Sequence, residues 1–200
     1  MQVRHPLERL LSTWRYIFQS KAWRQILTAF PEFNAGAILR SDRRLLDPSW
    51  PDFVTHILLD GANREGLTPG RLDAEYGRLW TRIAHHFAPY WLWCGTCQPG
   101  LRPDIILKME TLERDGAALM RMLNLTAVSE AGAQPPFERV HVVGPEEGAD
   151  GGYGVHSKTK VAEYYGQLTR RQVMDLYEMY RLDHELFNYS PDKYLALAKE

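Results

Sequence analysis

Apolar residues recur at every third or fourth position in several stretches of the chain, and this spacing predicts amphipathic helices. The stretch 6–19 has Pro6 in its first turn and is followed by three further helices at 71–87, 110–123 and 169–187. Thr169 is the predicted N-cap of the last of these. A short helix is predicted at 191–199. The apolar positions of the first helix are Leu7, Leu10, Leu11, Trp14 and Phe18.

Two short extended segments accompany these helices. Val3 ends a predicted strand at the start of the chain, and Ile105–Leu107 is an apolar run between Pro103 and Lys108 that suits a buried strand. Because a strand is followed by a helix in both places, we predict an α/β domain with a small parallel sheet flanked by helices. One domain is expected over residues 1–200. An apolar sheet edge is expected to be exposed, because no further strand precedes Met1.

The remaining stretches are rich in Pro, Gly, Asn and Asp. Residues 31–69 are predicted to form a surface excursion, with a short helix at 52–59 after the Ser49-Trp50-Pro51 turn. Residues 129–157 are predicted to form one long loop.

The composition argues against some classes of binding partner. The formal net charge of −1 argues against a polycation built for nucleic acid or an anionic membrane surface. The chain contains no apolar run of about eighteen residues and no export signal at Met1. Any anion-binding function must therefore come from a local cluster of residues.

One such cluster lies at the start of the first predicted helix. The strand end delivers Arg4 to the helix start, where backbone N–H groups and the helix dipole favour an anion. Arg9 and Ser12 share a face of this helix and could add a cation and a hydroxyl donor for a phosphate monoester. On composition alone, an ordinary amphipathic helix with arginines on its solvated side is the favoured alternative.

The pattern R-x-P-x-x-R-x-x-S-x-x-R, from Arg4 to Arg15, resembles the 3'-phosphate-binding motif of sulfotransferases. Further landmarks follow in the order of the Golgi carbohydrate sulfotransferases (sulfotransferase family 2), the group that sulfates chondroitin, dermatan and related glycans. They are 52–54, 86–89 with Cys94-Gly95-Thr96-Cys97, 108–115, 164–168 and 176–189. Phe87 and His184 depart from this pattern, which has a Trp and a Phe there.

The resemblance implies a P-loop-NTPase-like sulfotransferase domain that uses 3'-phosphoadenylyl sulfate (PAPS) as co-substrate and no metal. It assigns the 3'-phosphate to Arg4 and Ser12, with Arg9 beside them, and the sulfuryl acceptor to a glycan or proteoglycan. It also implies the luminal side of the Golgi membrane, with a signal anchor that is absent from this chain.

The family's strand and loop for the 5'-phosphosulfate are expected before the 3'-phosphate motif, and no such segment precedes Met1. A catalytically inactive truncated homologue that binds nucleotide or glycan is therefore the alternative function. A nucleotide kinase relative has little support, because G-x-x-x-x-G-K-[ST] is absent. No catalytic base is assigned.

Several other residues allow more than one interpretation. Cys94 and Cys97 could form a redox pair, half of a zinc site or, as favoured for a luminal protein, a disulfide. His86 is a predicted helix-capping residue or, less favoured, a general base. The basic segment His156–Lys160 could close over an anion or form a solvated turn. Asn124 and Asn188 lie in N-glycosylation sequons.

Overall fold

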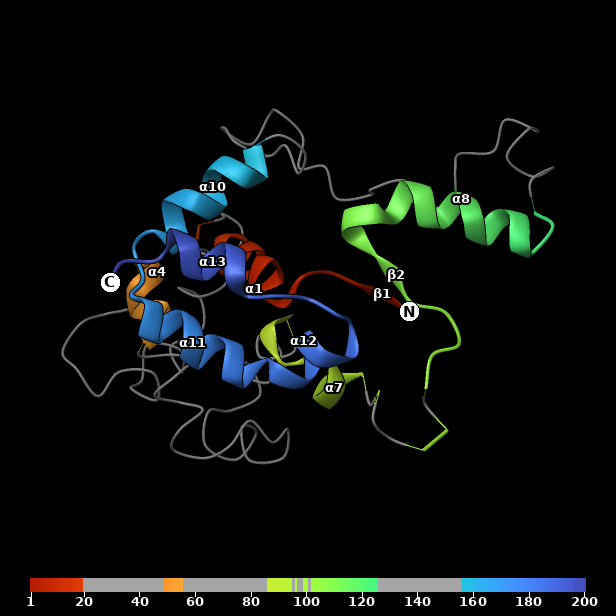
Figure 1. The fold of residues 1–200 in the computed structure, drawn as a ribbon, viewed down its shortest axis with the longest axis horizontal. Coiled ribbons are helices and arrows are strands. Elements are labelled where there is room, and N and C mark those ends of the chain that lie inside the picture. Colours follow the sequence, from red (N-terminus) through yellow and green to blue (C-terminus); the bar gives the residue numbers. More distant parts are fainter. Residues whose placement is uncertain (20–48, 56–85, 95, 97–98, 101, 126–155) are drawn as a thin grey trace, which may run out of the picture. The chain divides into compact units, whose positions relative to one another are not determined.

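The computed structural model describes residues 1–19, 49–55, 86–94, 96, 99–100, 102–125 and 156–200 (Figure 1). The chain divides into two compact units. The first comprises Met1–His5 and Pro103–Lys160, and the second comprises Pro6–Arg102 and Val161–Glu200. Most of the predicted helix at 71–87 and nearly all of the predicted excursion and long loop lie outside the described residues.

The first unit contains a two-stranded parallel sheet, which confirms the small parallel sheet predicted from the sequence. Strand β1 (Gln2–Val3) pairs with β2 (Leu107–Lys108) so that Gln2 lies opposite Leu107. After β2 the chain forms a 3-10 turn, η3 (Met109–Thr111), and then helix α8 (Leu112–Met122). Helix α8 buries Leu112 and Met120 and ends before Asn124, whose φ of 55° stops the helical path.

The second strand begins later than the sequence pattern predicted. Ile105 and Ile106 are 36% and 41% exposed and precede the strand instead of forming it. The Met1 amino group donates to the Ile105 carbonyl at 2.7 Å, and the Leu107 N–H donates to the Met1 carbonyl at 2.9 Å. Regular pairing begins one residue later, where Gln2 lies opposite Leu107.

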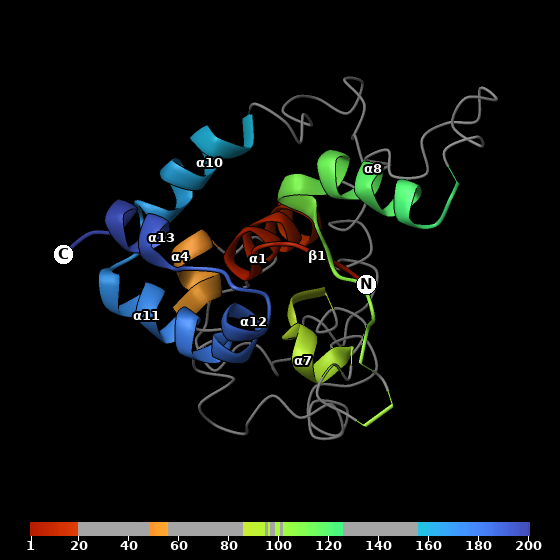
Figure 2. The same cartoon turned by 45° about the vertical axis from the view of Figure 1, so that its right-hand side comes forward.

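The second unit is helical and is arranged around α1 (Pro6–Trp14), which continues as a π-helical turn, η1 (Arg15–Gln19). Figures 1 and 2 show α1 surrounded by the short helices of this unit. Only the second half of α10 belongs to it. The surrounding helices are α4 (Trp50–Asp52), α7 (Tyr90–Trp93), α10 (His156–Tyr165), α11 (Arg170–Met179), α12 (Arg181–Leu186) and α13 (Asp192–Leu197).

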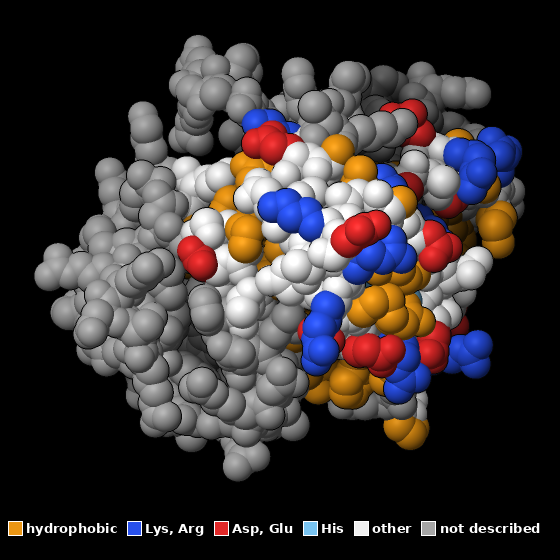
Figure 3. Space-filling model, turned by 60° about the vertical axis from the view of Figure 1, so that its left-hand side comes forward, with side chains coloured by type: hydrophobic (Ala, Val, Ile, Leu, Met, Phe, Trp, Pro, Cys, Tyr) orange, Lys and Arg blue, Asp and Glu red, His pale blue; other side chains and the backbone are white. Residues whose placement is uncertain are grey.

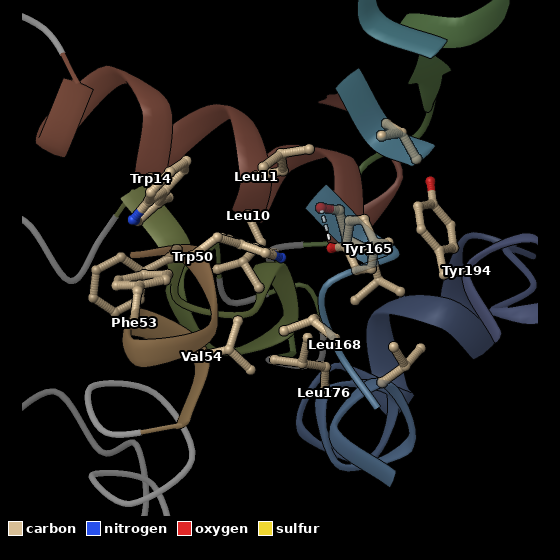
Figure 4. Packing of buried hydrophobic residues seen from close by; sticks show 14 of the residues in the cluster. Leu10, Leu11, Trp14, Trp50, Phe53, Val54, Tyr165, Leu168, Leu176 and Tyr194 are labelled. Carbon is tan, nitrogen blue, oxygen red and sulfur yellow. Dashed lines mark hydrogen bonds between the residues drawn. The ribbon is translucent and has the colours of Figure 1, made fainter. Parts of the chain in front are cut away.

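The core of this unit is aromatic and forms around the buried face of α1. Trp50 is 1% exposed and meets Trp14 edge to face, with ring centroids 5.5 Å apart (Figure 4). Trp50 enters the core because Ser49 caps α4: the Ser49 Oγ accepts the Asp52 N–H at 3.3 Å. The predicted apolar face of the first helix, Leu7, Leu10, Leu11, Trp14 and Phe18, is buried throughout.

The helix predicted over 169–187 is broken into α11 and α12. Its start is as predicted, because Thr169 and Gln172 form a capping box. At Tyr180 the backbone leaves the helical path, and the Tyr180 N–H is shared by the carbonyls of Leu176 and Tyr177. The sequence has no Gly or Pro at this position, so contacts made by the Tyr180 side chain elsewhere in the unit outweigh local helix propensity.

None of the helices that the structure describes combines the length and the hydrophobicity required to cross a bilayer. On the face shown in Figure 3, acidic and basic side chains of the described residues are interspersed. Exposed ion pairs of the second unit include Arg171–Asp175 and Arg181–Glu185.

Candidate functional site

The three predicted phosphate-binding residues lie on adjoining segments. Arg4 follows β1 directly and is half-buried in the first unit. Ser12 is half-buried in the second turn of α1, in the second unit. Arg9 lies on α1 three residues before Ser12, so these two side chains project from neighbouring positions of one helix.

Arg9 directs its guanidinium into the second unit. Its Nη1 donates to the His86 carbonyl at 3.2 Å, and its Nη2 donates to the Ala88 carbonyl at 2.6 Å. The guanidinium carbon also lies 4.2 Å from the centroid of the Tyr90 ring. Arg9 therefore joins α1 to the segment between His86 and Tyr90, with only 15% of its side chain exposed.

Asp183 completes this arrangement from α12. Its two carboxylate oxygens accept the N–H groups of Tyr90 at 2.7 Å and Trp91 at 2.9 Å, at the start of α7. Burial raises the pKa of Asp183, while these two hydrogen bonds and the positive charge of Arg9 act in the opposite direction. In the sequence, Asp183 is part of the landmark 176–189, and its spacing predicted no role for it.

Two hydroxyl groups also donate hydrogen bonds to carbonyls of the segment His86–Tyr90. The Thr13 Oγ1 donates to the His86 carbonyl at 3.1 Å, and the buried Tyr180 hydroxyl donates to the Phe87 carbonyl at 2.5 Å. Side chains of α1, α12 and the residue between α11 and α12 therefore fix the backbone from His86 to Trp91. Phe87 is buried within it, and so is His184 on α12, so both departures from the family pattern are core positions.

The first turn of α1 is fastened by the C-terminal helices. The Tyr165 hydroxyl donates to the Leu7 carbonyl at 2.7 Å. The Glu8 Oε1 accepts the Lys193 Nζ at 3.1 Å and the Tyr194 hydroxyl at 3.2 Å. Figure 4 shows Tyr165 and Tyr194 facing each other, with ring centroids 4.7 Å apart.

One donor before α1 is already bonded within the first unit. The Glu110 Oε1 accepts the His5 N–H at 2.7 Å, and Pro6 has no N–H to offer. Glu110 lies in η3, and its contact with His5 spans 105 positions of the sequence. Anion binding near His5 and Pro6 therefore depends on side chains more than on these two backbone positions.

Other predicted residues have simpler surroundings. Cys94 is an exposed residue and forms no disulfide with any residue that the structure describes; Cys97 lies outside that part of the chain. Partial desolvation of the Cys94 thiol raises its pKa. The His86 ring makes an edge-to-face contact with Tyr16, with centroids 6.1 Å apart. Residues 156–160, where a basic turn was one alternative, are part of α10. Asn124 and Asn188 are exposed and have φ of 55° and 50°.

Comparison with known proteins identifies the family. The sulfotransferase family profile matches residues 1–190. The chain belongs to the sulfotransferase family. This match confirms the family resemblance that the Arg4–Arg15 pattern and the later landmarks indicated.

Curated relatives of this sulfotransferase chain are distant. It is 22% identical to carbohydrate sulfotransferase 11 of Rattus norvegicus over 204 residues and 24% identical to that of Mus musculus. The Danio rerio protein of the same name is 23% identical over 200 residues. Each comparison covers 98% of this chain and 47% of the relative, so the chain spans about half the length of the relatives it matches. No solved structure matches the chain.

Proposed function

We propose that this chain forms the nucleotide-binding part of a carbohydrate sulfotransferase, which transfers a sulfuryl group from PAPS to a hydroxyl of a glycan or proteoglycan sugar. The observation that supports it is the family match over residues 1–190, which includes the Arg4–Arg15 motif at the junction of β1 and α1. A location on the luminal side of the Golgi membrane belongs to the same proposal.

In this proposal Arg4 and Ser12 contact the 3'-phosphate of the nucleotide. The planar fork of an arginine can bond two phosphate oxygens, and a serine hydroxyl adds a third donor. Arg9 contributes positive charge from the same helix face as Ser12. Asp183, 4.0 Å from the Arg9 Nη2, offsets that charge only in part, because the carboxylate is also shared with two backbone N–H groups.

The chemistry expected of such a site is an in-line displacement. The acceptor oxygen attacks sulfur while the bond between sulfur and the phosphate oxygen breaks, so the barrier depends on positioning and on neutralising negative charge. Residues that hold the nucleotide rigidly therefore contribute to the rate even when they touch no reacting atom.

The test is calorimetry with 3'-phosphoadenosine 5'-phosphate and with adenosine 5'-monophosphate, which lacks the 3'-phosphate. The first should bind more tightly. Since a charge-assisted hydrogen bond contributes about 1.5–3 kcal/mol, Arg4→Ala should weaken its binding roughly ten- to a hundredfold. Arg171→Ala on α11, where the Arg171 side chain is 89% exposed, is the matched control and should bind normally.

Equal affinity for the two nucleotides would contradict the proposal. A transfer assay with labelled PAPS and a glycan acceptor then separates the two forms of the function. Selective nucleotide binding without transfer would support the inactive homologue, whereas transfer to the sugar would establish the enzyme.

A further inference from the structure

The C-terminal helix holds the one acidic side chain in the first turn of α1. Glu8 is 17% exposed, and one of its oxygens accepts hydrogen bonds from both Lys193 and Tyr194, which are neighbours on α13. These contacts join residues 185 and 186 positions apart, within the second unit.

The position of Glu8 makes its charge relevant to an anion held on α1. Glu8 and Ser12 are four residues apart on one helix, so they share a face, with about 5–6 Å between their Cβ atoms. A carboxylate in the first turn is also attracted by the positive end of the helix dipole and therefore competes there with an anionic ligand. Glu8 is thus a like charge one turn away from the proposed phosphate contact.

Lys193 places a positive charge beside Glu8. Its ammonium group lies 3.1 Å from the Glu8 carboxylate, and it lies over the Tyr194 ring, 5.3 Å from the centroid. The Tyr194 hydroxyl holds the same carboxylate oxygen, and Tyr194 is itself fixed in the core against Tyr165. The Glu8 charge is therefore neutralised and directed toward α13.

We propose that Lys193 and Tyr194 are positioning residues for the nucleotide: they hold and neutralise Glu8 so that α1 can accept the 3'-phosphate. This inference rests on the proposed function. Lys193 should contribute little to the free energy of unfolding, because its side chain is 51% exposed and exposed ion pairs add little to stability. The Tyr165 bond to the Leu7 carbonyl fastens α1 independently of Lys193.

The experiment is a pair of variants in the full chain, Lys193→Met alone and together with Glu8→Gln, titrated with 3'-phosphoadenosine 5'-phosphate in low salt. Met keeps the length and the apolar stem of Lys193 but removes its ammonium group from beside the Glu8 carboxylate. Lys193→Met should weaken binding roughly three- to thirtyfold, as expected for a new like charge at this separation. Adding Glu8→Gln should restore the affinity, because the repelling charge is gone.

Two controls separate this effect from others. Lys199→Met removes an exposed lysine from the same chain end and should leave binding unchanged. Thermal melts should show all variants folded. The weakening by Lys193→Met should also fade at high salt, because added ions screen exposed charges.

Unchanged binding in Lys193→Met would overturn the inference. A loss that Glu8→Gln does not reverse would also overturn it and would assign Lys193 to direct contact with the ligand. Failure of the proposed function would give a different result: the unmodified chain would then bind 3'-phosphoadenosine 5'-phosphate and adenosine 5'-monophosphate equally.

Discussion

The buried Asp183 carboxylate lies 4.0 Å from the Arg9 guanidinium, and the two side chains bind opposite ends of one backbone segment. Arg9 donates hydrogen bonds to the carbonyls of His86 and Ala88, and Asp183 accepts hydrogen bonds from the N–H groups of Tyr90 and Trp91. The pair therefore connects α1, α7 and α12 through this segment, in which Ala88 and Pro89 belong to no helix or strand.

Replacement of Asp183 should destabilise the protein strongly. Asp183→Ala leaves the Arg9 charge without its carboxylate and two N–H groups without an acceptor, so we expect a loss of about 3–5 kcal/mol in the free energy of unfolding. Urea denaturation followed by circular dichroism measures this loss. Asp175→Ala is the control, because Asp175 is 49% exposed and its ion pair with Arg171 should contribute less than about 1 kcal/mol. Similar losses for both variants would contradict the proposed connection.

The hydroxyl of Tyr180 should contribute to stability separately from its ring. Tyr180→Phe keeps the buried ring but leaves the Phe87 carbonyl without this donor, which should cost about 1–3 kcal/mol. Tyr16→Phe, at a side chain that is 52% exposed, should change the free energy of unfolding little and keeps the ring contact with His86. An unchanged Tyr180→Phe variant would mean that water replaces the lost hydroxyl.

His184 should make the protein less stable in mild acid. Burial lowers the pKa of His184 below 6.5, so the folded state keeps the ring neutral while the unfolded state takes up a proton. Stability is therefore lost as pH falls from about 6.5 toward the lower pKa of the folded state. Between pH 7.5 and 5.5 the free energy of unfolding should fall by up to about 1 kcal/mol more than in His184→Phe. Equal pH dependence in both proteins would exclude His184 as the source.

Gly166 should not tolerate a side chain. A Cβ at this position would lie 2.8 Å from the Ala162 carbonyl oxygen, which is backbone and cannot move aside easily. We expect Gly166→Ala to lower the free energy of unfolding by about 1–3 kcal/mol, as other overpacked sites do. Gln167→Ala, at the exposed neighbour, should have a much smaller effect in the same denaturation experiment. Wild-type stability in Gly166→Ala would show that the backbone relaxes there.

The helices could be predicted because their apolar spacing is local information. Leu7, Leu10 and Trp14 repeat at the helical period, and Thr169 with Gln172 is a cap visible in the sequence. The break at Tyr180 could not be predicted in the same way, because no Gly or Pro marks it and the Tyr180 hydroxyl binds a carbonyl at Phe87, 93 positions away.

The sequence also could not predict that the Arg9 side chain points into the second unit. A helical pattern tells which residues share a face, but not which distant segment covers that face. Arg9 meets the carbonyl of His86, 77 positions away. Asp183 follows the buried residues Leu176 and Tyr180 at the spacing of one helix face. A charged residue at a predicted core position was the one available signal of Asp183's role, because such residues are almost always paired.

The long sequence separation of the contacts around α1 has a consequence for biosynthesis. The first turn of α1 is synthesised early, but its partners Tyr165 and Tyr194 follow 158 and 186 positions later. During translation α1 therefore lacks these two contacts until α13 has been synthesised. Contacts of this kind slow folding, because a long loop must close before they form. The second unit should therefore reach its native state only after α13 leaves the ribosome.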